Sequence, residues 1–325
     1  QVTKLLATGE WLYAAVWNTA DGAQLWRSAD GSAWEPLVGA IAATPNGFGK
    51  LDNAGITALG TFQGLLFVGT SSHDSPDGAE LWLSDDGGLT WQPVAGERIA
   101  LRMALGRESA YLQDFAVFGE SLYLAVGNPA SGSEIWRTTN GWTWEPVVGL
   151  PSRYEPGLDN PARDMIYQLR VFRDRLYAAV TSFHHEAGGE LWRTGSPDTW
   201  EVVVGDENPV HPAGFGDPTN YGIGTIAVFG EQLYVGTTHR DEPPQVWRSA
   251  DGERWEPLVG PWAPTPPGFG NSHTIGIQGL GAFREQLFAA TFNPEDGGEL
   301  WVFAPARDAP ASPPSEQPAE EIQGG

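Results

Sequence analysis

A small number of acidic side chains in the sequence could take part in acid–base chemistry. Asp114 and Asp164 stand at or within segments predicted as strands, and Glu186 follows two histidines. Cleavage of a glycosidic bond needs two carboxyl groups flanking the sugar linkage, and these three residues are the candidates for such a pair. No surrounding motif singles them out, so the sequence assigns none of them a catalytic role.

A larger set of polar and aromatic side chains could bind a ligand. Its members differ from one repeat of the chain to the next, whereas residues needed only for packing would recur. Tyrosine can stack on a sugar ring, and asparagine, aspartate, arginine and histidine can bond to its hydroxyls. The predicted ligand-binding residues are Tyr111, Asp114, Arg163, Asp164, Tyr167, Arg170, His184, His185, Asn220, Tyr221, His239 and His273.

The sequence predicts neither a metal ligand set nor a cofactor. His184, His185, Glu186 and His239 lie close enough in the chain to be considered, but their spacing matches no diagnostic metal motif. Calcium could bind at the acidic loops, because aspartate and asparagine oxygens suit a hard cation. Phosphate-loop, dinucleotide-binding and nucleophile-elbow phrases are absent from the sequence.

These side chains are carried by a repeat of about 55 residues that occurs six times. A Glu/Gln-Leu-Trp-Arg-like phrase recurs with its tryptophan at positions 26, 82, 136, 192, 247 and 301. A Leu-Tyr phrase precedes it, with the aromatic residue at positions 13, 67, 123, 177, 234 and 288. A third apolar phrase precedes that one, and a Trp-Glu-Pro-Val-Val-Gly phrase follows the tryptophan. Each copy therefore predicts four short strands, named A to D in chain order.

Four-stranded repeats of this kind cannot bury both faces of their sheets alone, so neighbouring copies must stack. Radial stacking gives a propeller, which leaves only short edges exposed. The sequence therefore predicts an all-β fold, a six-bladed β-propeller of four-stranded antiparallel blades. The last blade lacks its outer strand, because the chain after Phe303 contains no strand D phrase. Strand D is outermost, so we expect the inner ring to stay closed.

The composition changes after the last repeat. Residues 304–325 are rich in proline, alanine, serine and glutamate and contain no alternating apolar pattern. This composition predicts a flexible linker or tail that could connect to another domain or an anchor. The predicted domains are a propeller over residues 1–303 and a disordered tail over residues 304–325.

The turn between strands C and D has a recognisable sequence. Three copies read Ser-x-Asp-x-Gly or a close variant and continue to a tryptophan, with their aspartates at positions 30, 86 and 251. They resemble the Asp-box (BNR) hairpin of the sialidase-like propeller superfamily. The resemblance implies propeller architecture and structural aspartates. The sialidase arginine phrase is missing, so it does not imply sialidase activity. Asn140 replaces the aspartate in the third copy, and the fourth copy is degenerate.

Strand alternation assigns the loops to two faces of the propeller. The A–B and C–D turns are short and share one face. The D–A and B–C loops are longer, share the opposite face, and contain all six histidines of the chain. Three D–A loops carry Gly-Phe-Gly, whose phenylalanine is expected to fill the space between blades. Binding groups usually lie on long loops of a rigid scaffold, so the D–A/B–C face is the predicted functional face.

Composition limits the partners of the chain. The formal net charge of −23 repels nucleic acid and anionic lipid surfaces. No apolar run of 18 residues is present, so direct membrane insertion is not expected. The absence of cysteine leaves the redox compartment undefined. A chain starting at Gln1 is compatible with removal of a secretory signal, and we expect an extracellular, cell-surface or periplasmic location.

Two functions remain open from the sequence. The favoured one is a binding or interaction module that recognises a carbohydrate or protein partner on the D–A/B–C face. The alternative is a polysaccharide-active glycoside hydrolase or lyase with carboxylates at the channel mouth.

Overall fold

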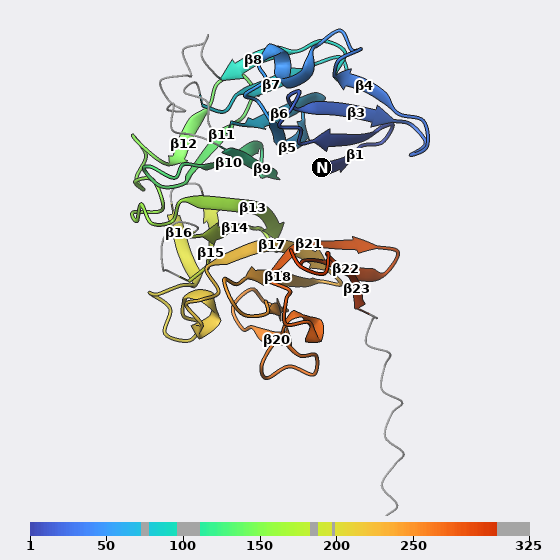
Figure 1. Ribbon diagram of the computed structural model, residues 1–325. Coiled ribbons are helices and arrows are strands. Elements are labelled where there is room, and N and C mark those ends of the chain that lie inside the picture. Colours follow the sequence, from blue (N-terminus) through green and yellow to red (C-terminus); the bar gives the residue numbers. More distant parts are fainter. Residues whose placement is uncertain (73–77, 96–110, 183–187, 197–198, 304–325) are drawn as a thin grey trace, which may run out of the picture.

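The chain folds into a succession of antiparallel β-sheets, as predicted (Figure 1). The computed structural model describes residues 1–72, 78–95, 111–182, 188–196 and 199–303. Apart from three single-turn 3₁₀ segments, the regular structure of these residues is all strand. The all-β propeller class is therefore confirmed, whereas the predicted count of six blades in the complete propeller stays a prediction. The proposed tail, residues 304–325, lies outside the described residues.

The strands form consecutive groups that we call blades one to six. Blades one to three consist of β1 (Val2–Ala7), β2 (Leu12–Val16), β3 (Gln24–Ser28), β4 (Glu35–Val38); β5 (Gly55–Phe62), β6 (Leu65–Ser71), β7 (Leu81–Ser84), β8 (Gln92–Ala95); and β9 (Tyr111–Phe118), β10 (Ser121–Gly127), β11 (Glu134–Thr138), β12 (Glu145–Val148). Blades four to six consist of β13 (Met165–Phe172), β14 (Arg175–Thr181), β15 (Glu190–Ser196), β16 (Thr199–Val204); β17 (Gly222–Phe229), β18 (Gln232–Thr238), β19 (Val246–Ser249), β20 (Glu256–Val259); and β21 (Gly276–Phe283), β22 (Gln286–Phe292), β23 (Leu300–Phe303).

Each blade pairs its strands in chain order, so strands A to D of the repeat become neighbours. Blade six has three strands within the described residues, in agreement with the missing strand D phrase. The A strands lie innermost, and β1, β5, β9, β13, β17 and β21 pack side by side in that order. Among the described residues β21 does not return to pack on β1 in the same way, so the expected closure of the inner ring is not seen.

The hydrophobic core lies between blades. Each large cluster of buried side chains combines residues of two successive blades, for example Phe67 of blade two with Phe115 and Trp144 of blade three. Burial of such aromatic side chains is the main favourable contribution to folding. A blade therefore buries its apolar side chains by packing on the neighbouring blades, as the apolar residues on its strands require.

The Gly-Phe-Gly segments supply part of this packing. They form the 3₁₀ turns η1 (Asn46–Gly49), η3 (Ala213–Gly216) and η4 (Pro267–Gly270). The Phe48 ring stacks on Trp82 with centroids 4.7 Å apart, and the Phe215 ring stacks on Trp247 at 4.4 Å. Phe269 stacks on Trp301 in the same way at 4.7 Å. Each phenylalanine lies against the tryptophan of the next blade, and none of them lines the central cavity described below.

The Asp-box turns hold the outer hairpins. In blade one the Asp30 carboxylate accepts hydrogen bonds from the backbone N–H groups of Ser32 (2.7 Å) and Ala33 (2.9 Å). Asn140 of blade three makes the same two contacts through its amide oxygen, at 2.8 and 2.9 Å. These side chains are therefore occupied by the turn itself.

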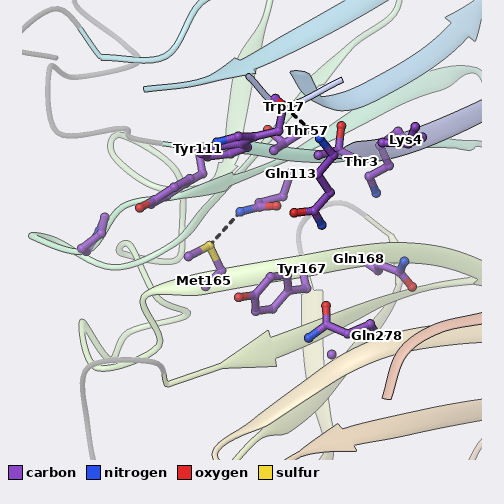
Figure 2. Close-up of a pocket in the computed structure, with 14 residues that line it drawn as sticks. Thr3, Lys4, Trp17, Thr57, Tyr111, Gln113, Met165, Tyr167, Gln168 and Gln278 are labelled. Atoms are coloured by element: carbon purple, nitrogen blue, oxygen red, sulfur yellow. Dashed lines mark hydrogen bonds between the residues drawn. The ribbon is translucent and has the colours of Figure 1, made fainter. Parts of the chain in front are cut away.

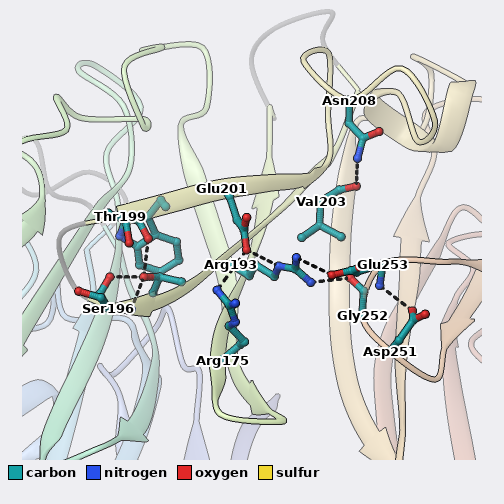
Figure 3. Close-up of polar contacts among 12 residues, drawn as sticks. Arg175, Arg193, Ser196, Thr199, Glu201, Val203, Asn208, Asp251, Gly252 and Glu253 are labelled. Carbon is teal, nitrogen blue, oxygen red and sulfur yellow. Dashed lines mark hydrogen bonds and ion pairs between the residues drawn. The ribbon is translucent and has the colours of Figure 1, made fainter.

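The arginine of the Trp-Arg phrase joins one blade to the next (Figure 3). Arg193 forms an ion pair with Glu201 of its own blade at 2.7 Å and donates to the Gly252 carbonyl of blade five at 3.3 Å. Arg27 of blade one reaches the Gly87 carbonyl of blade two at 3.0 Å. These contacts repeat at equivalent positions, so the arginines belong to the frame of the fold.

Candidate functional site

A β-bulge in every A strand directs one residue toward the centre of the molecule. The register between strands A and B skips one residue of strand A in each blade. A bulged residue is unpaired in the ladder and its side chain is re-aimed relative to its neighbours. The skipped residues are Thr3, Thr57, Gln113, Tyr167, Gly224 and Gln278.

All six bulge residues line one central cavity of about 740 Å³ (Figure 2). The B–C loop residues Trp17 and Pro129 border it, so the cavity opens on the D–A/B–C face. Its volume falls in the range of small-ligand sites, roughly 300–1,000 Å³. The other lining residues are Gln1, Val2, Lys4, Tyr111, Met165 and Gln168.

The lining of the cavity combines aromatic rings with side-chain amides. Trp17, Tyr111 and Tyr167 supply the rings, and four glutamines supply amide groups. Lys4 is the only side chain with a full charge in this lining among the described residues. Rings of this kind stack on the C–H faces of sugars, and amides both donate to and accept from sugar hydroxyls.

Tyr167 has the most perturbed titration of the lining residues. Burial, together with the charges of Tyr221, Tyr111 and Asp164, raises the pKa of its phenol to about 12. The phenol therefore stays protonated at neutral pH and can donate a hydrogen bond. A raised pKa is the opposite of what an activated phenolate nucleophile requires.

A second cavity of about 370 Å³ adjoins the first, since both are lined by Lys4 and Gln168. Asp114 and Arg170, two of the predicted ligand-binding residues, line this smaller cavity. One Asp114 oxygen lies 3.2 Å from Lys4 Nζ, and the other accepts a hydrogen bond from the Leu169 N–H at 3.0 Å. Asp114 therefore links the innermost strands of blades one, three and four.

Arg163 and Asn220 occupy equivalent places before the A strands of blades four and five. Arg163 forms a buried ion pair with Glu190 at 2.7 Å, and its guanidinium lies 4.9 Å from the centre of the Trp192 ring. The Asn220 amide donates to the Gly214 carbonyl at 2.9 Å and lies fully buried. Both side chains are engaged in anchoring D–A loops, and neither lines the central cavity.

The two described histidines of the predicted set also have local partners. His239 is buried, and its Nδ1 accepts hydrogen bonds from the N–H groups of Asp241 (3.0 Å) and Glu242 (2.6 Å). His273 is exposed, and its Nδ1 lies 2.8 Å from Asp296. The hydrogen bond to Asp296 and the charges of Glu295 and Asp296 raise the pKa of His273.

The remaining predicted residues divide between the cavity wall and its surroundings. Tyr111 lines the cavity. Tyr221 lies outside it, and the Arg240 guanidinium carbon stands over the Tyr221 ring, 4.8 Å from the ring centre. Asp164 is fully buried directly before β13, the strand that carries Tyr167. His184, His185 and Glu186 lie outside the described residues.

Two further features concern only the residues that the structure describes. No three histidine or acidic side chains among them are grouped in a way that could hold a metal ion. No helix in the described ranges has the length and apolarity needed to cross a membrane.

The bulge positions were not recognised as a set from the sequence, although a signal for them exists. In strand A the two main apolar residues are three positions apart, as in Ile56 and Leu59 or Ile166 and Leu169. A regular strand would place residues of one face two or four positions apart. The odd spacing indicates one inserted residue, and it identifies the variable position that faces the cavity.

Comparison with known proteins supports the fold. No family model and no curated protein matches the sequence. Among solved structures, the α-L-arabinofuranosidase Arb93A of Fusarium graminearum, in complex with an iminosugar inhibitor, matches with a TM-score of 0.50 and 13% identity. The match covers 92% of this chain and 91% of that one. An ancestral GH74 enzyme matches with a TM-score of 0.54 and 16% identity, over 94% of this chain and 38% of its own length.

This comparison corrects the favoured functional prediction. Both of these solved structures are β-propeller glycoside hydrolases. The prediction of a binding or interaction module is therefore contradicted, and the alternative of a polysaccharide-active enzyme agrees better with the similar structures.

Proposed function

We propose that this chain is a glycoside hydrolase that acts on a polysaccharide at the cavity on the D–A/B–C face. The observation that carries this proposal is the lining of the cavity, in which three aromatic rings and four glutamine side chains surround about 740 Å³. Such a lining suits the alternating C–H faces and hydroxyl groups of a sugar. The similar solved structures are named as an arabinofuranosidase with an iminosugar inhibitor and a GH74 enzyme, which agrees with a carbohydrate substrate.

The access to the cavity is compatible with a polymer substrate. The Gly-Phe-Gly phenylalanines, which could have filled the channel mouth, stack on tryptophans of neighbouring blades instead. Tyr111 and Trp17 stand at the rim, where strands A and B meet their long loops. Among the described residues, these phenylalanines therefore leave the cavity open toward the D–A/B–C face, from which a sugar chain can enter.

Hydrolysis requires a proton donor and a second carboxylate, and we assign these roles to Asp114 and Asp164. Asp114 lines the adjoining cavity and is paired with Lys4, so it can supply negative charge opposite an oxocarbenium-like transition state. Asp164 precedes β13, whose residues Met165, Tyr167 and Gln168 line the central cavity. The neutral Tyr167 phenol, whose pKa is raised in part by the charge of Asp164, provides a hydrogen-bond donor in the central cavity.

The test is an assay for release of reducing ends from a panel of neutral and acidic polysaccharides. We expect hydrolysis of at least one polymer by the unmodified chain. Asp114→Asn and Asp164→Asn should each lower kcat at least about 100-fold, the typical contribution of general acid–base catalysis. Asp30→Asn, in an Asp-box turn on the opposite face, is the matched control and should retain activity.

The outcomes separate the two parts of the proposal. If no polymer is cleaved, glycoside hydrolysis is refuted. If cleavage occurs but survives both substitutions, the assignment of the carboxyl pair is wrong, and Glu186→Gln tests the third predicted carboxylate. Secretion into the culture medium or periplasm of a producing cell would test the location that we propose for this activity.

A further inference from the structure

Blade one exposes an apolar face that every other blade buries. By strand register, Val2 corresponds to Ile56, Leu112, Ile166, Ile223 and Ile277, which are all fully buried against the preceding blade. Val2 is 56% exposed. Leu5 corresponds to Leu59 and Leu169, whose exposures are 7% and 0%, yet it is 64% exposed.

Blade six exposes the complementary face. Leu300 corresponds to the leucine of the Glu-Leu-Trp phrase, which in blades one and two is Leu25 (0% exposed) and Leu81 (1% exposed). Leu300 is 68% exposed. Phe283 is 60% exposed, whereas its equivalents Phe62 and Phe172 are buried against the following blade. Blade six therefore presents half of a blade–blade interface without its other half.

The space around equivalent glycines also shows that blades one and six each lack a neighbouring blade on one side. A Cβ atom on Gly60 would lie 2.9 Å from the Cβ atom of Phe115 in the next blade. The equivalent Gly281 of blade six has no atom within 4 Å of such a Cβ. In the Asp boxes, Gly87 lies against Arg27 of the preceding blade, whereas Gly31 of blade one has nothing within 4 Å.

The two exposed faces lie on the same side of the molecule in Figure 1, dark blue for blade one and orange to red for blade six, with no strand drawn between them. Blade one lacks a preceding neighbour, and blade six lacks a following one. Five interfaces between successive blades occur along the chain. They show which residues of a neighbouring blade pack on each of these two faces.

We propose that the assembled propeller contains a further antiparallel blade of the same repeat type, seated between blade six and blade one. Its Ile/Leu-bearing A strand and its tryptophans pack on Phe283 and Leu300, as those of blade five pack on blade four. Its own Glu-Leu-Trp leucine packs on Val2 and Leu5, as Leu25 packs on Ile56 and Leu59. Chemical complementarity at both edges identifies a blade of this repeat as the occupant, and the inference does not depend on the proposed hydrolysis.

The first experiment asks whether blade six contacts blade one directly in the unmodified ring. The chain has no cysteine, so an introduced pair supplies the only thiols. Leu5→Cys with Gly281→Cys is the test pair. Gly60→Cys with Phe115→Cys is the matched control at the equivalent positions of blades two and three, where the Cβ atoms come within disulfide range after a small shift.

We expect the control pair to form a disulfide under mild oxidation and the test pair to remain reduced. Circular dichroism verifies that both variants are folded. If the test pair oxidises as completely as the control, blade six closes directly on blade one and the proposal is overturned.

The second experiment adds the missing blade. A copy of residues 250–303 inserted after Phe303 gives blade six a strand D and adds three strands of one further blade. We expect a higher melting temperature and lower acrylamide quenching of tryptophan fluorescence, because Trp34 and Trp301 become covered. A matched insertion in which the copied Leu300 and Trp301 are serine keeps the added strand D but lacks the apolar face that packs on blade one. It should therefore raise the melting temperature less and leave Trp34 open to acrylamide.

Two results would overturn the proposal. One is an inserted segment that is cut by protease as fast as the serine-bearing control insertion, with unchanged quenching. The other is concentration-dependent dimerisation of the unmodified chain that protects its tryptophans, which would make a second copy the occupant of the exposed faces.

Discussion

The packing residues between blades, which we call the frame, repeat from blade to blade, whereas the bulge residues that line the cavity, which we call the mouth, differ from blade to blade. In the contacts between blades, equivalent positions carry the same or a similar residue in successive blades, such as the tryptophan of the Glu-Leu-Trp phrase and the leucine, isoleucine or valine before it. At the bulges lining the mouth, six equivalent positions carry threonine twice, glutamine twice, tyrosine and glycine. The five interfaces between successive blades have the same packing geometry and therefore use similar residues, whereas the cavity must place different chemical groups around one ligand. Substitutions in the two regions should therefore affect different properties.

The largest expected effect is on the frame. Trp247→Ala removes the ring that stacks on Phe215 and leaves a cavity between blades four and five. We expect a loss of about 3–5 kcal/mol in the free energy of unfolding, as for other buried aromatic truncations. Denaturant titration measures this loss. Trp262→Ala is the matched control, because Trp262 is 79% exposed. A similar loss in both variants would contradict the division between frame and mouth.

A smaller effect is expected at the mouth. Tyr167→Phe keeps the ring but removes the hydroxyl donor, so kcat/KM for a polymer that the chain cleaves should fall about two- to tenfold. The free energy of unfolding near neutral pH should change little, because Tyr167 lines the cavity and, within the part of the chain that the structure describes, belongs to no Asp-box turn and to no aromatic stack between blades. A drop in stability comparable to that of Trp247→Ala would place Tyr167 in the frame.

The same residue gives a pH prediction. Burial and nearby charges raise the pKa of Tyr167 to about 12 in the folded protein, against about 10 in an unfolded chain. A raised folded-state pKa means that the stabilisation is complete below pH 10 and is lost as the pH rises toward 12. Ultraviolet titration should show a tyrosine ionising near pH 12 that is missing in Tyr167→Phe. Ionisation of every tyrosine near pH 10 would contradict it.

The smallest effect is expected in the Asp boxes. Asp86 accepts hydrogen bonds from Thr90 and Ser84, and these outweigh burial and lower the pKa of its carboxyl to about 2. Asp86→Asn should change stability by less than about 0.5 kcal/mol at neutral pH, because Asn140 already holds an equivalent turn. The contribution of the carboxylate is present above pH 3.8 and is lost as the pH falls through 2, so acid unfolding curves should diverge there. A loss of several kcal/mol at pH 7 would show that the charge itself holds the turn.

The frame could be predicted from the sequence because it is periodic. Strand identity, order and pairing followed from the six phrases, and the three described strands of blade six agree with the lack of a strand D phrase after Phe303. The open side between blades six and one could not be predicted, since a repeat pattern fixes each interface but not the number of copies that close a ring. Exposure of Val2 and Leu300 reveals it only in three dimensions.

The site was predictable in part. Tyr111 and Tyr167 were selected as polar or aromatic residues at strand A and do line the cavity. Arg163 and Asn220 were selected by the same criterion, yet Arg163 pairs with Glu190 of β15, and Asn220 bonds to Gly214 within its own D–A loop. Residue type alone cannot distinguish a loop anchor from a ligand contact, because both are buried polar groups that need partners. The odd apolar spacing at the bulges was the more informative signal.

The bulges have a consequence for how this protein can change. A bulged residue lies outside the strand ladder, so the side chains of Gln113, Tyr167 and Gln278 can be replaced without breaking the pairing within a blade. The other three bulge positions are tied to their neighbours: the Thr3 and Thr57 hydroxyls donate to the Ile56 and Leu112 carbonyls of the next blade, and a Cβ atom on Gly224 would lie 2.7 Å from Thr238 Oγ1. A library randomised at Gln113, Tyr167 and Gln278 would therefore explore new ligand preferences while these contacts stay unaltered.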